Sequence, residues 1–337
     1  LPFSNHKIVV IMYFKNFSIL SVICLASFLF VSCSDEYEVP DGVTKLTNDC
    51  IKRSLGPNVV GGQIEFAYAM ALPREKGRLV SARVQASISG AEGTYMEHRS
   101  YHTDDVGTDV GVEIGSPSET NGGVTEVHFT VDTCASTLRY YYIIPEEARG
   151  REVSFTFSAE SSNGQAVNYK MGPYKISNMD MKLDIELKNN TYFSIEDMRT
   201  YTPAEAAQHP EKIDFIYLFR QMRGVKFLHA FVSPTADKDY LPGVTVPESF
   251  TNSTKMMRVY ASADQQLARN EFGVFVDDVD LQQIDVSNSP IFVINMVETG
   301  GIWAETADGR YKAYIYINSA PETRAGMTVS MKRLKVR

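Results

Sequence analysis

Residues 80–88 read VSARVQASI, and this stretch decides the fold because apolar and polar side chains alternate along it. An extended chain points successive side chains to opposite faces, so the positions from Val80 to Ile88 form one apolar and one polar face. The same alternation recurs over residues 64–72, 127–131, 153–157 and 181–187, with turn signals rich in Gly and Asn between them. Short strands with one apolar face each close most readily as two packed antiparallel sheets, so we predict a β-sandwich domain over residues 46–188.

The pattern changes near Asn189-Asn190, which we interpret as a domain boundary. In the next segment, Thr202 is suited to cap a helix, Pro203 to occupy its first turn and Glu205 to complete a capping box. Residues 213–219 (IDFIYLF) and 291–296 (IFVINM) are apolar on both faces, as strands covered on both sides are. We therefore predict a second sandwich-like domain, residues 189–337, that is β-rich with one or two short helices.

Composition limits the classes of partner. The chain has 337 residues, 44% of them apolar, which is enough material for two hydrophobic cores. Its formal net charge is −8, and residues 1–32 carry two lysines and no acid, so the remainder is more negative still. Nucleic acids and anionic lipid surfaces require a basic footprint. This balance argues against nucleic acid as the main partner.

The first residues predict export. Residues 17–31 (FSILSVICLASFLFV) are uncharged, follow Lys15, and are shorter than the roughly 20 apolar residues of a membrane span. A cationic start, a short apolar middle and a small residue before the cut describe a secretory signal peptide, here residues 1–32. Met12 is a candidate for the true start.

The end of that segment adds an anchor. Phe30-Val31-Ser32-Cys33 resembles the lipobox of bacterial lipoproteins, in which the cysteine thiol receives a diacylglycerol and becomes the mature N-terminus. Ser34, Asp35 and Glu36 resemble the acidic tag that sends Bacteroidetes lipoproteins to the cell surface. The resemblance implies lipidation of Cys33 and an outer-membrane location facing the medium. The residues that follow are acidic and interrupted by Pro40 and Gly42, so we predict a flexible tether over residues 33–45. An ordinary cleaved signal with a chance cysteine is the alternative.

Cys50 and Cys134 are the cysteines that follow Cys33. An oxidising compartment would permit a disulfide between them, and two unpaired buried thiols are the alternative that spacing leaves open.

A wider resemblance rests on three segments. These are Tyr140–Ser177, residues 191–219 (TYFSIEDMRTYTPAEAAQHPEKIDFIYLF) and residues 308–320 (DGRYKAYIYINSA). They look like an uncharacterised family of Bacteroidetes surface lipoproteins, over most of residues 45–337. The resemblance implies two β domains, the first immunoglobulin-like, and assigns no chemistry to any residue.

The sequence lacks a nucleophile elbow, HExxH, a P-loop, GxGxxG and an EF-hand loop. A glycoside hydrolase needs two carboxylates from any two strands and leaves no local signature, so that class stays open. Glu146 and Glu147 follow a proline at a strand end, but adjacent side chains point apart. We identify no catalytic residue and no cofactor from the sequence.

Two groups of residues are weak candidates for metal ligands. His98 and His102 have a zinc spacing only on a helix, whereas the polar residues and glycines over 90–123 predict a long loop. Asp278 and Asp280 would share a face if VDDVD (residues 276–280) is extended, and they are candidates for calcium. Calcium needs six or more oxygens, so a solvated strand edge is the alternative.

Sugar binding requires aromatic rings on the surface. Trp303 lies in a loop-like context (GGIWAETADG), and Tyr314 and Tyr316 share one face of the strand KAYIYIN. These three are the candidates for stacking on a ligand, and packing in the core is the alternative. Tyr95 and Tyr101, in the predicted long loop, are secondary candidates.

The leading hypothesis is a non-catalytic surface lipoprotein that binds an extracellular glycan or a partner in a nutrient-uptake assembly. A structural or adhesive surface protein is the second hypothesis, and a glycoside hydrolase without a local motif is the third.

Overall fold

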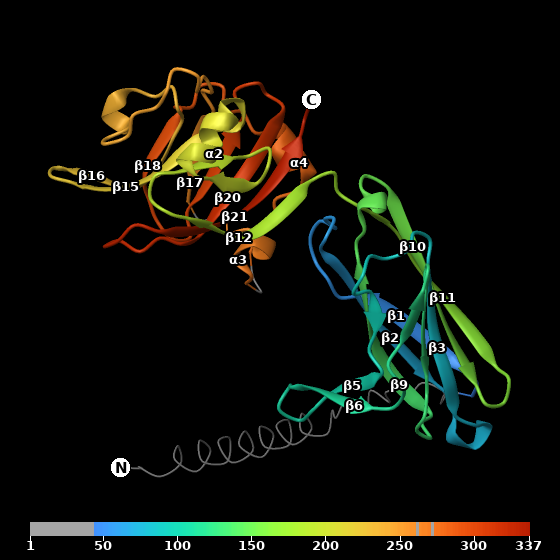
Figure 1. The fold of residues 1–337 in the computed structure, drawn as a ribbon. Helices are drawn as coiled ribbons and strands as arrows, with labels where there is room; N and C mark the ends of the chain where they lie inside the picture. Colours follow the sequence, from blue (N-terminus) through green and yellow to red (C-terminus); the bar gives the residue numbers. More distant parts are fainter. Residues whose placement is uncertain (1–43, 261–262, 271–272) are drawn as a thin grey trace, which may run out of the picture. The chain divides into compact units, whose positions relative to one another are not determined.

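The computed structural model describes residues 44–260, 263–270 and 273–337. The predicted signal peptide, Cys33 and the acidic residues Ser34, Asp35 and Glu36 lie outside the described residues. Nearly all regular structure is antiparallel β, in sheets that form two sandwiches (Figure 1). The predicted mainly β, sandwich-like fold is confirmed.

The first domain pairs a four-stranded sheet, ordered β1-β2-β9-β4, with a five-stranded sheet, ordered β11-β10-β3-β8-β7. A further pair, β5-β6, forms a separate hairpin. The strands are β1 Thr47–Lys52, β2 Gln63–Ala71, β3 Leu79–Ala86, β4 Tyr95–Met96, β5 Arg99–Thr103, β6 Asp109–Glu113, β7 Glu119–Asn121, β8 Val124–His128, β9 Ala135–Ile143, β10 Glu152–Ser161 and β11 Ala166–Lys175, with 3-10 turns η1 Arg74–Lys76 and η2 Glu146–Ala148.

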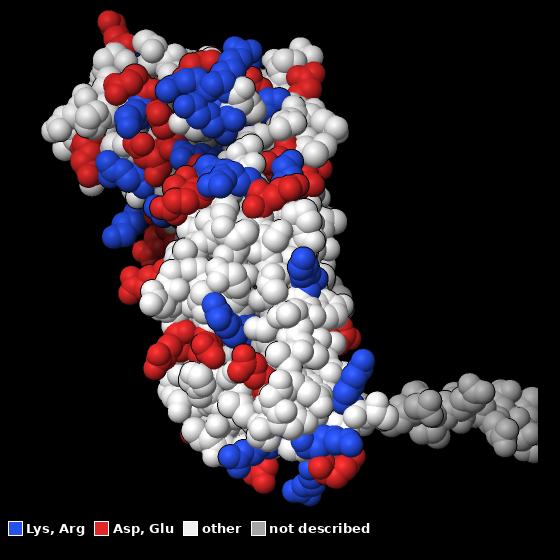
Figure 2. All heavy atoms as spheres, turned by 90° about the vertical axis from the view of Figure 1, so that its right-hand side faces the viewer, with Lys and Arg blue, Asp and Glu red and all other residues white. Residues whose placement is uncertain are grey.

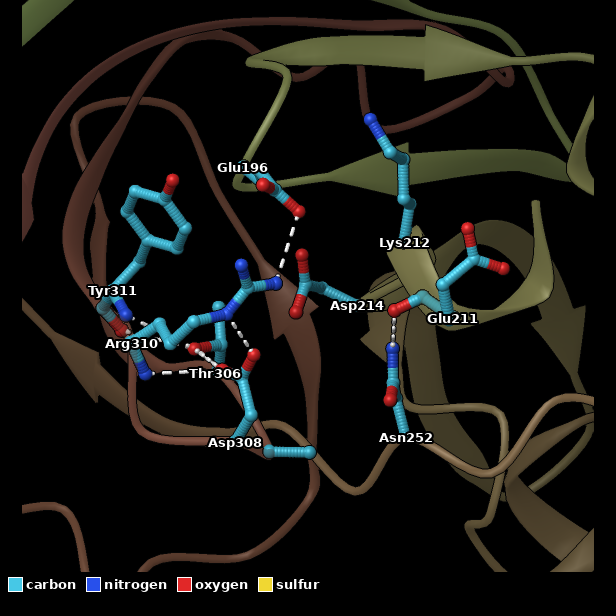
Figure 3. Close-up of a pocket in the computed structure, with 10 residues that line it drawn as sticks. Glu196, Glu211, Lys212, Asp214, Asn252, Thr306, Asp308, Arg310 and Tyr311 are labelled. Atoms are coloured by element: carbon cyan, nitrogen blue, oxygen red, sulfur yellow. Dashed lines mark hydrogen bonds and ion pairs between the residues drawn. The ribbon is translucent and has the colours of Figure 1, made fainter. Parts of the chain in front are cut away.

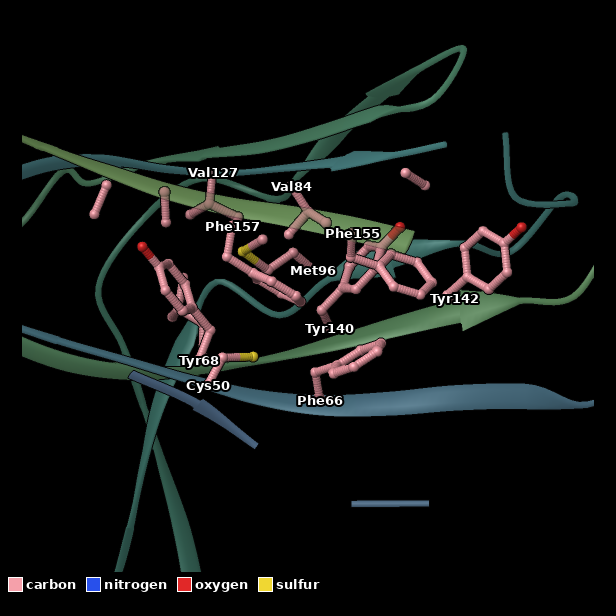
Figure 4. Close-up of a cluster of buried hydrophobic side chains, with 14 of the residues drawn as sticks. Cys50, Phe66, Tyr68, Val84, Met96, Val127, Tyr140, Tyr142, Phe155 and Phe157 are labelled. Atoms are coloured by element: carbon pink, nitrogen blue, oxygen red, sulfur yellow. The ribbon is translucent and has the colours of Figure 1, made fainter. Parts of the chain in front are cut away.

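Aromatic side chains fill the space between these two sheets (Figure 4). Phe66 from β2 meets Phe155 and Phe157 from β10, with ring centroids 4.8 and 5.2 Å apart. The alternation along β2 and β10 makes this possible, because every second residue of each strand is buried. Burying such rings is the largest favourable contribution to a sandwich of this kind.

The predicted loop over residues 90–123 is wrong in one respect. The segment contains four short strands, β4 to β7, among them the β5-β6 hairpin. Val106, at the tip of that hairpin, is 84% exposed. Its polar composition misled the prediction, since a two-stranded hairpin that stands out from the sandwich has little apolar surface to bury.

The outer face of the sheet that holds β3, β10 and β11 is mostly uncharged. Thr156 lies opposite Gln85 on one side and Lys170 on the other, and Ser158 lies opposite Arg83. Figure 2 shows few charged side chains across the middle of this face.

The second domain also has two sheets, ordered β12-β21-β20-β19-β17 and β14-β13-β15-β16-β18. The strands are β12 Asp180–Leu187, β13 Thr191–Ser194, β14 Arg199–Tyr201, β15 Phe215–Met222, β16 Val225–Val232, β17 Lys255–Val259, β18 Phe292–Met296, β19 Gly301–Glu305, β20 Tyr311–Ser319 and β21 Met327–Lys335. The helices are α2 Pro203–Gln208, α3 Gln265–Ala268 and α4 Asp278–Gln283, with 3-10 turns η3 Pro210–Lys212 and η4 Lys238–Tyr240. Among the described residues, no helix is long and apolar enough to cross a bilayer.

Both faces of the β15-β16 sheet are buried. Phe215 and Phe231 face the opposite sheet, whereas Ile216 and Val232 face a second apolar cluster under the loops of residues 233–250. This confirms the prediction made from residues 213–219. Helix α2 begins after Thr202, which forms the predicted capping box with Glu205.

The domain boundary lies earlier than predicted. Strand β12 pairs with β21, so residues 180–187 belong to the second domain rather than to 46–188. The alternation along this strand was recognised correctly, but a periodic pattern does not say which sheet a strand joins.

Candidate functional site

Two of the three main aromatic candidates for stacking on a ligand, Tyr314 and Tyr316, are core residues instead. Tyr314 and Tyr316, on β20, are 0% and 6% exposed and pack with Leu267 of α3 and Leu281 of α4. Burial raises the pKa of the Tyr314 hydroxyl. Trp303, on β19, is half-buried and packs against Tyr314 with ring centroids 4.6 Å apart. The prediction for Tyr314 and Tyr316 is corrected, because helices α3 and α4 cover the face that was expected to be wet.

The predicted calcium ligands begin a helix rather than line a strand edge. Asp277 caps α4 by accepting hydrogen bonds from the backbone N–H groups of Val279 and Asp280, and Asp280 accepts one from Asp277. Asp278 accepts hydrogen bonds from the Ser177 hydroxyl and the Asn178 N–H. Their carboxylates are therefore already used within the protein. The described residues contain no group of three or more His, Cys, Asp or Glu that could hold a metal ion.

The possible disulfide is also corrected. Cys50 lies opposite Tyr68 of β2, whereas the Cys134 carbonyl accepts a hydrogen bond from the Leu72 N–H, four residues further along β2. Four residues of strand span about 13 Å, far beyond the reach of a disulfide. Both thiols are free, and burial raises the pKa of the Cys50 thiol to about 12, which keeps it protonated and inert.

The remaining candidates from the sequence lie apart. His98 and His102 lie in and beside strand β5, where residues four apart are too distant to share a metal. Glu146 begins the turn η2 and pairs with Arg149.

A small polar hollow, with a volume of about 20 Å³, lies in the second domain at one end of the β15-β16 sheet. Figure 3 shows the side chains around it. Its lining residues are Glu196, Glu211, Lys212, Asp214, Asn252, Thr306, Ala307, Asp308, Arg310 and Tyr311. Most of its charges are already paired: Arg310 contacts Glu196 at 3.2 Å and also Asp308, and Lys212 contacts Asp197 at 3.1 Å.

Asp214 is the buried acid of this hollow. Burial raises the pKa of its carboxyl to about 7, and hydrogen bonds from the Ile195 N–H and the Thr254 hydroxyl oppose that rise. Burial also raises the pKa of Asp308, but hydrogen bonds from Thr306 and Arg310 outweigh it and bring that pKa to about 2. Two carboxyls with separated pKa values are what acid–base catalysis requires. Asp214, however, is 3% exposed and each of its oxygens already accepts a protein donor, so it serves as a structural junction.

A second cluster lies on the outer face of the β1-β2-β9-β4 sheet, and we name it the tyrosine face. It consists of Tyr95, Tyr101 and Tyr141 with Arg53, Glu65, Glu97, Arg99, Asp109 and Arg139 around them. Tyr95 and Tyr141 are opposite one another on β4 and β9, and their rings stack at 4.9 Å with planes 20° apart. Tyr95 remains 41% exposed.

The β5-β6 hairpin completes this face. The Arg139 guanidinium lies 4.1 Å from the centre of the Tyr101 ring of β5 and forms an ion pair with Asp109 of β6. The side chain of Arg139 is 14% exposed, so this contact is largely shielded from water. The sequence does not show that Tyr95 lies beside Tyr141, because strand β4 has only two residues and is too short to show an alternating pattern.

Comparison with known proteins shows the family to which the chain belongs. Two family models match it: a domain of unknown function (DUF4466) over residues 43–176 and another (DUF8576) over residues 177–336. A crystal structure of a DUF4466 family protein from Parabacteroides merdae is 47% identical, covers 87% of this chain and 100% of its own, and superimposes with a TM-score of 0.82. The chain belongs to the DUF4466 family. This confirms the predicted kinship with an uncharacterised two-domain Bacteroidetes family.

Two further solved structures are only remotely similar to this DUF4466 protein. The C-terminal fragment of the major pilin GBS80 of Streptococcus agalactiae is 10% identical with a TM-score of 0.28, covering 85% of this chain and 91% of its own. The major pilin subunit BcpA of Bacillus cereus is 8% identical with a TM-score of 0.27, covering 80% and 58%. Likeness at this level supports no functional conclusion. No curated protein matches the chain.

Proposed function

We propose that this DUF4466 protein is a non-catalytic lipoprotein of the outer cell surface and that it binds an extracellular glycan at the tyrosine face. The observation that carries the proposal is the stacked pair of Tyr95, which is exposed, and Tyr141, which is half-buried. An aromatic ring offers the flat apolar surface on which the C–H face of a sugar ring packs. The guanidinium and carboxylate groups beside the pair can hydrogen-bond to sugar hydroxyls.

The proposed anchor is Cys33, followed by the export residues Ser34, Asp35 and Glu36. These residues precede the part of the chain that the family models match, which begins at residue 43. Several acyl chains would make the attachment to the outer membrane stable, and the tether to residue 45 would hold the domains in the medium. The Bacteroidetes source of the solved relative supports this location.

A structural or adhesive role is the second candidate, and the β5-β6 hairpin favours it. Val106, Val110 and Val112 are exposed apolar side chains on this hairpin. Exposed apolar surface on an edge is where another protein chain can pair. A protein partner in a nutrient-uptake assembly would be bound in the same way.

A glycan array on the full mature protein, made lipid-free by Cys33→Ser, tests glycan binding. Tyr95→Ala should weaken binding about tenfold, the equivalent of one lost aromatic stack. Tyr260→Ala is the matched control, because Tyr260 is 55% exposed but lies in the second domain. Equal signals from the two variants would contradict the tyrosine face as the binding site.

The anchor has its own test. Metabolic labelling with a fatty-acid analogue should mark the wild type and leave Cys33→Ala unmarked, and protease added to intact cells should remove the wild type. A wild type that stays unlabelled would refute the lipoprotein proposal.

A further inference from the structure

The charges of the tyrosine face balance one another. Arg53 contacts Glu65 at 3.3 Å, Arg99 contacts Glu97 at 2.8 Å, and Arg139 pairs with Asp109. The hydrogen bond from Arg99 is the main cause that lowers the pKa of Glu97, so this pair is ionised at neutral pH. Three guanidinium groups therefore face three carboxylates.

This balance selects a class of ligand. A sulfate or uronate group is recognised by an arginine that is free to make bidentate hydrogen bonds. Here each arginine already has a carboxylate partner, and displacing that partner would leave an unpaired acid beside the incoming anion. Sugar hydroxyls can share the same groups without breaking the pairs, since a hydroxyl both donates and accepts.

From this arrangement we infer that the tyrosine face binds an uncharged saccharide and rejects acidic ones. The inference rests on the proposed function. It adds that the hexose ring packs on Tyr95 while its hydroxyls reach the ion pair of Glu97 and Arg99.

An array that carries both neutral and uronate- or sulfate-bearing glycans tests the inference. Neutral glycans should bind with little dependence on salt, and Tyr95→Ala should weaken them about tenfold. Asp109→Asn, which removes an exposed partner of Arg139, should add binding of acidic glycans that fades as salt rises. Tyr95-dependent binding of acidic glycans alone by the wild type would overturn the inference and leave the proposed function intact. If Tyr95→Ala bound every glycan as well as the wild type does, both the inference and the proposed function would be overturned.

Two Asn-Gly pairs stand in hairpin turns of the first domain, and the protein holds them differently. In the β10-β11 turn, the Asn163 amide oxygen accepts hydrogen bonds from the Ser161 hydroxyl at 2.6 Å and the Gln165 N–H at 3.2 Å. The Gly164 N–H donates to the Ser161 carbonyl at 2.9 Å. In the β7-β8 turn, neither the Asn121 amide nor the Gly122 N–H hydrogen-bonds to another described residue, and the space around Gly122 is open.

The difference in hydrogen bonding should affect how fast each Asn-Gly pair deamidates. The backbone nitrogen of Gly122 attacks the side-chain carbonyl carbon of Asn121, ammonia leaves, and water opens the resulting succinimide to aspartate or isoaspartate. At Asn163 both the carbonyl and the attacking nitrogen are engaged. We also propose that Asn121 is the site at which this protein deamidates, and that the fold protects Asn163.

Peptide mapping by mass spectrometry after incubation at mildly alkaline pH tests this proposal. Asn121 should deamidate several-fold faster than Asn163 in the folded protein, and the two should become equal in urea. Ser161→Ala removes one of the two hydrogen bonds that hold the Asn163 side chain and should raise the rate at Asn163. Equal rates in the folded protein, or an intact Asn121, would overturn the proposal.

Discussion

The two sandwiches differ in what covers their sheets. In the first domain, strands such as β10 bury every second residue and leave the others toward solvent. In the second, residues on both faces of β15 and β20 are buried, because loops and the helices α3 and α4 lie over the outer faces. An aromatic residue on the outer face of a strand is therefore a surface group in one domain and a core group in the other. Tyr141 and Tyr314 illustrate the two outcomes.

A buried ion pair holds helix α3 on the sheet of the second domain. Breaking this pair should have the largest effect on the free energy of unfolding. Lys332 of β21 contacts Asp264, the N-cap of α3, at 2.6 Å, and both side chains are fully buried. Lys332→Met leaves the Asp264 charge without its cation and should lower the free energy of unfolding by about 3 to 5 kcal/mol in urea titrations. Arg269→Ala, in an exposed pair with Asp184, should change it by less than about 1 kcal/mol. Similar losses in the two variants would contradict the contrast.

The buried Asp214 should make stability depend on pH. Its folded pKa of about 7 exceeds its unfolded value, so the folded state holds the proton more tightly. The resulting stabilisation is fully present below pH 3.8 and is lost as pH rises through 7. In Asp214→Asn the amide oxygen can still accept from the Ile195 N–H, and the amide nitrogen can donate to the Thr254 hydroxyl. This variant should flatten the pH dependence by on the order of 4 kcal/mol. Parallel pH profiles of stability for the wild type and Asp214→Asn would show that Asp214 does not cause the pH dependence.

Helix α4 gives a smaller test of the cover. Asp277→Ala removes the cap of α4 and should cost about 1 kcal/mol of stability, measured by thermal unfolding. An unchanged melting temperature would contradict the role of Asp277 as the cap of α4.

The open face of the first domain should tolerate change best. Arg83→Gln, on the outer side of β3, should alter the unfolding free energy by less than about 0.5 kcal/mol. A loss above about 1 kcal/mol would mean that this face is covered as the faces of the second domain are.

The sequence pattern predicts an element correctly where one physical rule decides its structure. The strands over residues 64–72 and 153–157 follow from alternation, and helix α2 follows from its capping box at Thr202. It also recognised the buried strands 213–219 and 291–296. These features are local, so a short window of sequence contains them.

The sequence pattern does not predict burial or neighbours that depend on a distant segment of the chain. Nothing near Tyr314 or Tyr316 shows that α3 and α4 will cover them, and nothing near Tyr95 shows that β9 will bring Tyr141 beside it. Asp277 and Asp280 form a capping box that could have been recognised, but the run of acids was interpreted as a solvated strand edge with weak candidates for calcium. The sequence therefore ranked Tyr314 and Tyr316, which are buried, above Tyr95, which is exposed. The lipidation of Cys33 stays a prediction.

The pairing of β12 with β21 has a further consequence. Asp180 lies opposite Arg333, and their side chains form an ion pair at 2.8 Å, so the first and last strands of the second domain are neighbours. A circular permutant of this domain should therefore be feasible, with those strands joined by a short linker and new termini opened at the exposed Arg223-Gly224 turn.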